Sequence, residues 1–313
     1  MASTEASPVI SVLVPVFNWD VSRLAHSLLE EIRSERLEGQ IEIIFADDCS
    51  TAKEIQAANR TALSVLQAAS VSYLELERNL GRAAIRNHLV EQSTGEFLLF
   101  LDADVIPDNR NFLRCYLEHV RADSCDVVCG GISYAQRILT GPEYDFYVYM
   151  SSRAGIRAAA IRNLQPWRWM FTSNVMLRRA AFDATPFDRR FTGYGYEDVE
   201  WSIRLARKFR VLHVDNPVSH LGLHDPRKVL EDMHGSIQNY RLLAMIHPDA
   251  YAETSIAPVV RILRRSPAWA LRSLDRLAVR AFLALSGIHV LAFFLFQFDK
   301  AVLLALAFQK PLD

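Results

Sequence analysis

The stretch FLLFLDADVIP, from Phe97 to Pro107, joins an unbroken apolar run to two aspartates one residue apart. The apolar part is typical of a strand that is buried on both faces of a parallel sheet. Asp102 and Asp104 follow where this strand would end. Two carboxylates at this spacing can turn toward one point and hold Mg²⁺ or Mn²⁺, but the same residues also begin ordinary turns. The rest of the chain must distinguish a metal site from a turn.

Apolar strand-like segments alternate with segments of helical composition in the first hundred residues, and this alternation predicts an α/β fold with a mixed, mostly parallel sheet flanked by helices. Because the carboxyl ends of parallel strands meet at one edge, we expect the polar residues that follow them to converge there. Those residues are Asn18, Asp47, Asp48, Asp102 and Asp104. The predicted strands are Val9–Phe17, Ile41–Ala46, Val71–Leu76 and Glu96–Leu101, and the predicted helices are Val21–Leu37, Ala52–Ala69 and Gly81–Gln92.

The second half of the chain is less regular. Strands are predicted at Asp126–Tyr134, Met170–Leu177 and Val211–Val214, and the glycine-rich segment Phe191–Glu200 opens a helix that runs to Lys208. No repeat or low-complexity linker interrupts the chain. We therefore expect one domain over residues 1–255 and a helical, apolar C-terminal tail over residues 256–313.

Composition narrows the class of protein. The chain has 313 residues and a formal net charge of −1, so it has no broad basic field, and we expect no nucleic-acid partner. The N-terminal MASTEASP lacks the basic and apolar parts of a signal peptide, and the four cysteines form no CxxC pair. Both features favour a cytoplasmic protein with reduced thiols.

The tail combines six arginines with the apolar run Ala281–Phe298, which Asp299 and Lys300 interrupt before the sequence AVLLALAF. This run is at the lower length limit for a helix that spans a membrane. The arginines favour helices that lie on an anionic membrane surface, and thus a peripheral protein on the cytoplasmic face. A buried helical hairpin or a dimer contact is the alternative.

Two basic residues lie where a phosphate could bind. Arg82 and Arg86 are four residues apart and share a helix face, where they could neutralise a diphosphate or simply form a solvated surface. A carboxylate of Asp47 or Asp48 could accept a hydrogen bond from a base or a ribose, but both residues are also common in turns.

Two further groups could take part in chemistry. Glu197 and Asp198 begin a helix, whose dipole stabilises Asp198 as an anion and thus as a general base; ordinary helices also carry acids in their first turn. His220 and His224 follow the last predicted strand. A neutral imidazole would suit Mn²⁺ better than Mg²⁺, although a lone histidine is more often structural.

Taken together, these stretches resemble the family 2 glycosyltransferases of the GT-A fold. The matching pieces occur in the family's order between about residues 9 and 225: SVLVPVFN, FADDCS, RNLGRAAIRNHLVEQSTGEFLLFLDADVIP, TSNVMLRR and GYGYEDVEWSIRLARK. The resemblance implies a Rossmann-like, nucleotide-binding sheet. It also implies an inverting enzyme that moves a sugar from a nucleotide-diphosphate donor, expected to be UDP-linked, to a hydroxyl of a glycan or lipid-linked acceptor in cell-surface polysaccharide biosynthesis. The glutamine-x-x-arginine-arginine-tryptophan element of polymerising members is absent, so we expect a non-processive enzyme.

The family's roles are carried over by position, as what the resemblance implies. Asp198 would be the catalytic base, with Glu197 beside it. Mn²⁺ or Mg²⁺ would be held by Asp104, Asp102 and His220, with His224 as a less favoured substitute. The acceptor would meet Trp169, Asn174 and Gly195, although core packing explains the aromatic stretch around Trp169 equally well. The nucleotide sugar would contact Pro15, Phe17, Asn18, Asp47, Asp48, Arg82, Arg86, Asp102 and Ala103.

Two other classes of protein share parts of this pattern. A sugar nucleotidyltransferase also has acidic metal ligands on a parallel sheet, but it should carry a glycine-rich, basic loop where this chain has PVFNWD. A degenerate member could bind sugar nucleotides as a scaffold without catalysis. The presence of Asp102, Asp104 and Asp198 argues against a scaffold.

Overall fold

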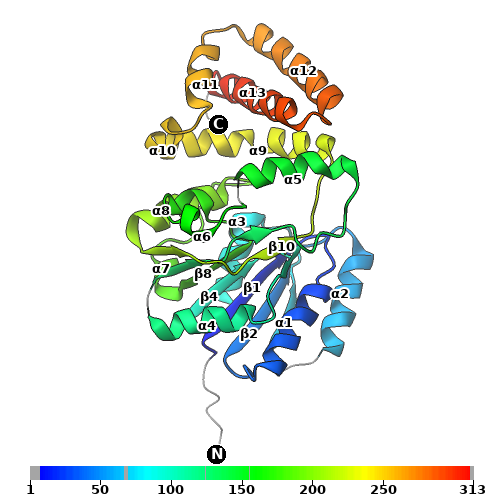
Figure 1. Ribbon diagram of the computed structural model, residues 1–313, viewed down its shortest axis with the longest axis vertical. Helices are drawn as coiled ribbons and strands as arrows, with labels where there is room; N and C mark the ends of the chain where they lie inside the picture. Colours follow the sequence, from blue (N-terminus) through cyan, green and yellow to red (C-terminus); the bar gives the residue numbers. More distant parts are fainter. Residues whose placement is uncertain (1–7, 67–69, 124, 155, 311–313) are drawn as a thin grey trace, which may run out of the picture. The chain divides into compact units, whose positions relative to one another are not determined.

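The computed structural model describes residues 8–66, 70–123, 125–154 and 156–310 (Figure 1). Its contacts divide the chain into two compact units, each built from segments that are distant in sequence. The first comprises Met1–Ile138, Gly155–Arg189 and Trp201–Gly222, and the second Leu139–Ala154, Arg190–Glu200 and Leu223–Asp313. The predicted boundary at residue 255 falls inside the second unit, and a separate catalytic domain and tail remain a prediction.

The first unit is organised around a seven-stranded sheet. β1 pairs in parallel with β2 and β4, so the carboxyl ends of these three strands lie at one edge, whereas β8 runs antiparallel to β4 and β6. The predicted α/β fold with a mixed, mostly parallel sheet is confirmed. The strand order is β3 (Val71–Glu75), β2 (Ile41–Asp47), β1 (Ile10–Val16), β4 (Phe97–Leu101), β8 (Asn174–Arg178), β6 (Val127–Cys129) and β9 (Val211–His213).

Helices cover both faces of this sheet because successive strand residues point to opposite sides. Val12 and Val14 of β1 pack into one core cluster with α1, α2 and α4, whereas Leu13 packs into another with α3, α7 and α8 (Figure 1). Trp201 of α8 is fully buried and stacks on Phe187. The helices are α1 (Ser22–Ser34), α2 (Lys53–Val65), α3 (Arg82–Glu91), α4 (Phe112–Ala122), α6 (Ala159–Arg162), the 3₁₀-helix η2 (Pro166–Trp169), α7 (Arg179–Asp183) and α8 (Glu197–Lys208).

The first unit also contains a small, separate three-stranded sheet, which the sequence pattern did not predict. It consists of β5 (Val105–Pro107), β10 (Val218–His220) and β7 (Ile132–Ser133). The single strand expected at Asp126–Tyr134 is therefore wrong: it is split into β6 and β7, which belong to different sheets. Gly130 and Gly131 separate them, and Gly131 has a φ of 89°, a conformation that favours glycine.

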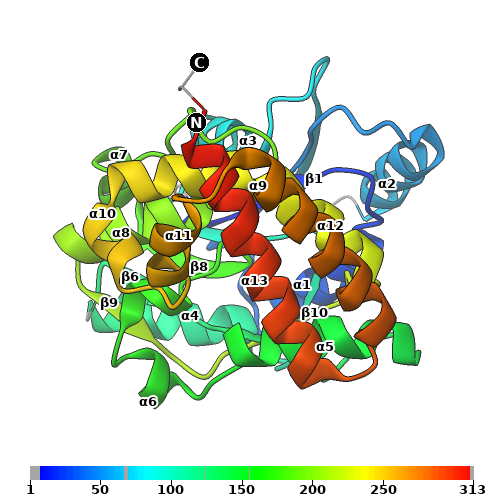
Figure 2. The ribbon, with the colours of Figure 1, turned by 90° about the horizontal axis from the view of Figure 1, so that it is seen from above.

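The second unit is helical. Its core is formed by apolar side chains of α5, α9, α12 and α13, and the ring centroids of Phe146 and Phe282 lie 4.9 Å apart. Figure 2 shows α12 and α13 lying along one another. The elements are the 3₁₀-helix η1 (Pro142–Tyr144), α5 (Asp145–Ala154), α9 (Pro226–Ile246), α10 (Pro248–Ala252), α11 (Ala257–Leu263), α12 (Ala268–Leu285) and α13 (His289–Phe308).

The apolar run Ala281–Phe298 is not one helix. α12 ends at Leu285 and α13 begins at His289, so the run is divided by a short turn that contains Gly287. Among the described residues, α13 alone is long and apolar enough to cross a membrane, and 44% of its most apolar window is buried in the protein. A core helix meets the same criteria, so this observation does not test the predicted association with a membrane.

Candidate active site

Asp104 lies beside His220 because the two short strands place them there. β5 follows Asp104 directly and pairs antiparallel with β10, with Val105 opposite His220. The backbone N–H of Leu221 also donates a hydrogen bond to the carbonyl of Asp104, at 2.8 Å. As a result, His220 Nε2 lies 3.4 Å from Asp104 Oδ2. His220 thus lies in a strand that the sequence analysis did not predict.

The space around the Asp104 carboxylate depends on Gly222. A Cβ atom at this position would lie 2.2 Å from Asp104 Oδ2, so only glycine leaves the carboxylate where it is. Burial raises the pKa of Asp104, Asp102 adds to this effect, and the nearby His220 opposes it. A carboxylate and an imidazole that face one another in this way suit a divalent cation such as Mn²⁺.

Asp102 has different partners from Asp104. Its Oδ1 accepts a hydrogen bond from Arg86 at 2.7 Å, and its Oδ2 accepts one from the Ser173 hydroxyl at 2.7 Å. Burial alone would raise the pKa of Asp102, but the charge of Arg86 and the hydrogen bond from Ser173 outweigh burial and lower it. Asp102 is therefore held as an anion by the protein itself. No pattern in the sequence marks Ser173 as a partner of Asp102.

The two arginines of α3 also differ in their burial and in their partners. Arg86 is 2% exposed, and besides its ion pair with Asp102 it donates to the backbone carbonyl of Arg82. Arg82 is exposed in the first turn of α3. Arg86 thus orients Asp102, whereas Arg82 is the side chain of the pair that a diphosphate in solution can reach.

Asp47 and Asp48 are both engaged in shaping turns. Asp48 accepts hydrogen bonds from the backbone N–H groups of Leu80 and Gly81, at 2.6 and 2.9 Å, and so fixes the loop before α3. Asp47 is fully buried, and donors of the protein reach both of its oxygens. These donors are Ser50 N, Ser50 Oγ, Gln56 Nε2 and Tyr73 Oη. The structure therefore gives Asp47 a structural role.

The end of β1 presents the remaining nucleotide-site candidates. Pro15 lies in the strand opposite Ala46, and Phe17, just beyond it, is 48% exposed. Asn18 has a φ of 52°, and its Oδ1 accepts a hydrogen bond from the backbone N–H of Ala52 at 2.8 Å. Phe17 is thus the exposed aromatic side chain at the edge where β1, β2 and β4 end. Ala103 lies between the two aspartates and is half-buried.

Two of the predicted acceptor residues belong to the first unit. Asn174 is 2% exposed, accepts a hydrogen bond from Tyr116 and donates to the carbonyls of Gly131 and Asn216. These contacts use the donors of its side-chain amide, so Asn174 has a structural role here. The ring of Trp169 is half-buried, and the Arg157 guanidinium lies 5.1 Å from its centroid.

Arg162, which no sequence pattern identifies, is a buried arginine that holds the ends of β6 and β9. It is 2% exposed, and its guanidinium donates to the carbonyls of Cys129 and Val214 and to Nδ1 of His213, at 2.8 Å. His213 Nε2–H then donates to the carbonyl of Pro166. This arrangement requires a neutral His213.

The second unit includes an unusual loop and the first turn of α8, up to Glu200, while the rest of this helix belongs to the first unit. Gly193, Gly195 and Tyr196 all have positive φ, and Tyr196 stacks on Tyr240 with centroids 4.4 Å apart. Asn239 fixes the loop by donating to the carbonyls of Thr192 and Gly195, each at 2.8 Å.

The loop delivers Glu197 and Asp198 to the first turn of α8, where Glu197 is buried and Asp198 is half-buried. An aspartate at this position is stabilised as an anion by the helix dipole. The alternative metal ligand His224 also belongs to the second unit, and there its Nδ1 lies 2.9 Å from Asp232 Oδ2.

A cavity of about 390 Å³ lies within the second unit. Its wall includes Tyr194–Tyr196 and Val199, which flank Asp198 in the sequence, together with apolar side chains such as Phe293 and Phe296. Lys300 lines the same cavity, with its ammonium 4.9 Å from the ring of Phe296. Burial lowers the pKa of Lys300 to about 8.

Comparison with known proteins supports the interpretation of these features. The sequence model described as "Glycosyl transferase family 2" matches residues 11–184, which contain β1 from its second residue, β2 to β4, and both aspartates of the Asp102–Asp104 pair. The chain belongs to glycosyl transferase family 2. Both the predicted family and the predicted GT-A fold are confirmed.

Relatives of this family 2 chain share about a quarter of its residues. Glycosyltransferase AglE of Haloferax volcanii is 26% identical over 206 residues, which are 64% of this chain and 62% of AglE. WcaA of Escherichia coli K12, which carries the name of a colanic acid biosynthesis glycosyl transferase, is 26% identical over 219 residues, or 67% of this chain and 74% of WcaA. The match therefore spans less than two thirds of AglE.

A solved structure shows the same fold. The mannosyltransferase PcManGT from Pyrobaculum calidifontis, in complex with GDP-Man and Mn²⁺, has a TM-score of 0.55 at 16% identity. The similarity covers 97% of this chain and 87% of that protein. At this identity the comparison establishes the fold of the family 2 chain.

Proposed function

We propose that this family 2 protein is an inverting, non-processive glycosyltransferase that moves a sugar from a nucleoside-diphosphate donor to a hydroxyl group. The observation that carries the proposal is the pair of differently held aspartates after β4. Asp102 is held as an anion by Arg86 and Ser173, while Asp104 faces His220. The fold is shared with a mannosyltransferase in complex with GDP-Man and Mn²⁺.

Asp104 and His220 would hold the divalent cation. Their oxygen and nitrogen ligands fit Mn²⁺ better than Mg²⁺, which prefers oxygen ligands alone. Bound there, the cation would supply stabilisation of the charge that develops on the departing diphosphate. Exposed Arg82 would add a second positive charge for the same phosphates. We expect the donor nucleotide to be UDP. Residues other than Asp104, His220 and Arg82 would recognise its nucleobase.

Asp198 would act as the general base. Its position in the first turn of α8 favours the ionised carboxylate, which can accept the proton of the attacking acceptor hydroxyl. The acceptor oxygen then forms its bond to the anomeric carbon as the bond to the diphosphate oxygen breaks, and this single displacement inverts the anomeric configuration.

The cavity of the second unit would receive the acceptor. Its wall combines aromatic and apolar side chains with the charged groups of Arg153, Asp232 and Lys300. Asp232 is already paired with Lys228, whereas no hydrogen bond or ion pair engages the Lys300 ammonium within the described residues. An acceptor that suits both features has an apolar part and an anionic group, as a lipid-linked glycan with a phosphate does. The residues that flank Asp198 belong to the same wall, which fits an acceptor whose hydroxyl is to be deprotonated.

A lipid-linked acceptor would be presented at a membrane surface. We therefore include in the proposal that the enzyme takes part in cell-surface polysaccharide biosynthesis. Large apolar side chains on the α12–α13 hairpin are exposed, Trp269 by 70% and Phe294 by 63%. Exposed arginines share α12 with Trp269, namely Arg272, Arg276 and Arg280. Apolar and basic side chains together favour a peripheral position on the cytoplasmic face.

The test of the catalytic assignment is a panel of nucleotide sugars in Mn²⁺, with transfer and donor binding measured separately. Asp198→Asn should lower the transfer rate by roughly 10²–10⁴-fold and leave donor binding intact, since it removes only the base. Asp104→Ala should weaken donor binding in Mn²⁺ but not in chelator. Asp183→Asn, at an exposed position in α7, is the matched control.

Other outcomes separate the alternatives. Donor binding without any turnover across the panel would indicate a scaffold. Release of pyrophosphate from a nucleoside triphosphate and a sugar phosphate would indicate a nucleotidyltransferase. Equal transfer rates in wild type and both variants would remove Asp198 and Asp104 from the mechanism.

The acceptor proposal has its own measurement. Lys300→Met should raise the KM for an anionic, amphiphilic acceptor by roughly tenfold or more, because a charged hydrogen bond is lost, and should leave donor hydrolysis unchanged. Lys310→Met, at an exposed position, is the control. Equal KM values for anionic and neutral acceptors would contradict the role of Lys300.

Sedimentation of the protein with anionic and neutral vesicles, with Trp269→Ser as the variant, tests its binding to a membrane surface.

A further inference from the structure

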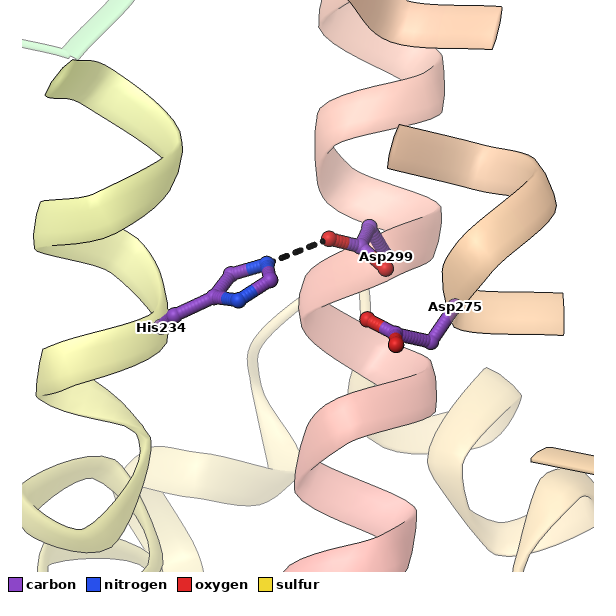
Figure 3. Close-up of side chains that lie close together, drawn as sticks. All are labelled: His234, Asp275 and Asp299. Carbon is purple, nitrogen blue, oxygen red and sulfur yellow. Dashed lines mark hydrogen bonds and ion pairs between the residues drawn. The ribbon is translucent and has the colours of Figure 1, made fainter. Parts of the chain in front are cut away.

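Three helices of the second unit bring together side chains that the proposed reaction does not use. His234 comes from α9, Asp275 from α12 and Asp299 from α13 (Figure 3). One ligand atom from each lies within 4.8 Å of the others, and His234 Nε2 lies 3.0 Å from Asp299 Oδ2. Figure 3 shows the three side chains pointing toward a common space between the helices.

Asp299 is an unusual residue for its position. It is fully buried in the most apolar helix of the unit, and its Oδ1 atom has no hydrogen-bond partner in the part of the chain that the structure describes. Oδ1 of Asp275 has no donor among the described residues either, and burial together with the neighbouring Asp299 raises the pKa of the Asp275 carboxyl group. A buried carboxylate oxygen without a partner is costly, and a second carboxylate within a few ångströms increases that cost.

The histidine compensates for only part of this charge. A protonated His234 would bring one positive charge to two carboxylates, and it reaches only one oxygen of Asp299. A divalent cation would bring two positive charges and would contact the oxygen atoms that lack partners. The side chain of His234 is 38% exposed, so an ion and its water ligands can enter from that side.

The ligand set indicates which cation fits. One imidazole nitrogen with two carboxylate oxygens suits Zn²⁺ and related transition metals, whereas Mg²⁺ and Ca²⁺ prefer oxygen ligands alone. Ligand atoms of a tetrahedral Zn²⁺ site are roughly 3.3 Å apart, so small rotations of these side chains would complete the site. Three protein ligands leave the fourth position to water.

We propose that His234, Asp275 and Asp299 form a binding site for a divalent transition metal, with Zn²⁺ as the best fit, which joins α9 to the α12–α13 hairpin. The site shares no residue with Asp104 and His220. Its role is structural, because it links three helices that are distant in sequence, and it does not depend on the proposed glycosyl transfer.

The experiment is a titration of metal-free full-length protein with Zn²⁺, without nucleotide, followed by calorimetry and by melting temperature. Asp104→Ala is used as the background, so that the proposed catalytic cation site does not contribute. We expect one tightly bound Zn²⁺ and a rise in melting temperature. In this background, His234→Gln and Asp299→Asn should each weaken the affinity at least tenfold and abolish the rise.

The controls make each result decisive. His26→Gln changes an exposed histidine of α1 and should leave binding intact, which excludes adventitious binding to surface histidines. If Asp299→Asn does not fold, His234→Gln still tests the site, because its side chain lies at the surface. Absence of Zn²⁺ binding in the Asp104→Ala protein would overturn the proposal, as would unchanged affinity in His234→Gln; the carboxyl groups would then share a proton instead.

Discussion

In the first unit, hydrogen-bond donors of the protein meet Asp47, Asp48 and Asp102, which follow strands, whereas in the second unit Asp299 and Asp275 each keep one oxygen without a donor among the described residues. The difference follows from the backbone. Loops at strand ends leave N–H groups available, and Leu80 and Gly81 donate theirs to Asp48. Inside a helix the N–H groups are already bonded to carbonyls of the previous turn, so a buried acid must find its partner elsewhere. In the helical unit, a ligand is the partner that fits.

The largest effect is expected from breaking a matched pair in the first unit. Arg86→Met leaves Asp102 without its cation, and we expect a loss of about 3–5 kcal/mol in the free energy of unfolding, measured by urea denaturation. Arg60→Met breaks the exposed ion pair with Glu75 and should change stability little. Similar losses in the two variants would show that Arg86 does not compensate a buried charge.

A second effect concerns pH and the neutral histidine of the first unit. Burial and the nearby Arg162 lower the pKa of His213 to about 4, against about 6.5 in an unfolded chain. Below pH 6.5 the unfolded state therefore binds a proton that the folded state does not. The resulting stability is present above pH 6.5 and is lost as the pH falls to about 4.

This loss should amount to about 3 kcal/mol and should be reduced in His213→Gln. Chemical denaturation at several pH values measures it, with His26→Gln, at an exposed position, as the control. If the wild type and His213→Gln show the same pH dependence, the pKa of His213 is the same in the folded and the unfolded protein, and burial does not lower it.

The smallest effect has the opposite sign and belongs to the second unit. In metal-free buffer, Asp299→Asn should raise the melting temperature, with a gain of about 1 kcal/mol, because the new amide can donate to the oxygen of Asp275. Asp225→Ala removes the cap of α9, which accepts from Arg227 and Lys228, and should cost about 1 kcal/mol. A loss of stability in Asp299→Asn would show that the ion pair with His234 stabilises the protein more than the unpaired oxygen destabilises it.

The parts of the fold that the sequence predicted are those with strong local signals. The apolar runs of β1, β2 and β4 are long enough to identify a parallel sheet, and the polar residues that follow them do lie at one edge. β5 and β10 have only three residues each, and their pairing joins Val105 to His220 across more than a hundred residues. No local pattern reveals such a pairing, although it is what brings His220 to Asp104.

The sequence does not reveal which polar side chains are buried. Arginine and aspartate usually lie at the surface of a protein. Only the three-dimensional structure shows that Arg162 and Asp47 are buried and that their polar groups form hydrogen bonds inside the protein. For the apolar run Ala281–Phe298, the sequence favoured helices on a membrane surface and left a buried hairpin as the alternative, but it did not locate the turn. The residues on both sides of this turn are apolar, so the composition does not change there, and only Gly287 marks it.

Gly222 has a consequence for how members of this family could lose activity. An alanine there would push the Asp104 carboxylate away from His220, since the new methyl group would occupy the place of Oδ2. Such a protein would keep every acidic and imidazole ligand in its sequence and yet lack the space in which they meet. On the proposed assignment of Asp104 and His220 to the cation, a census of ligand residues would count such a protein as an enzyme, although its ligands could not meet at one ion.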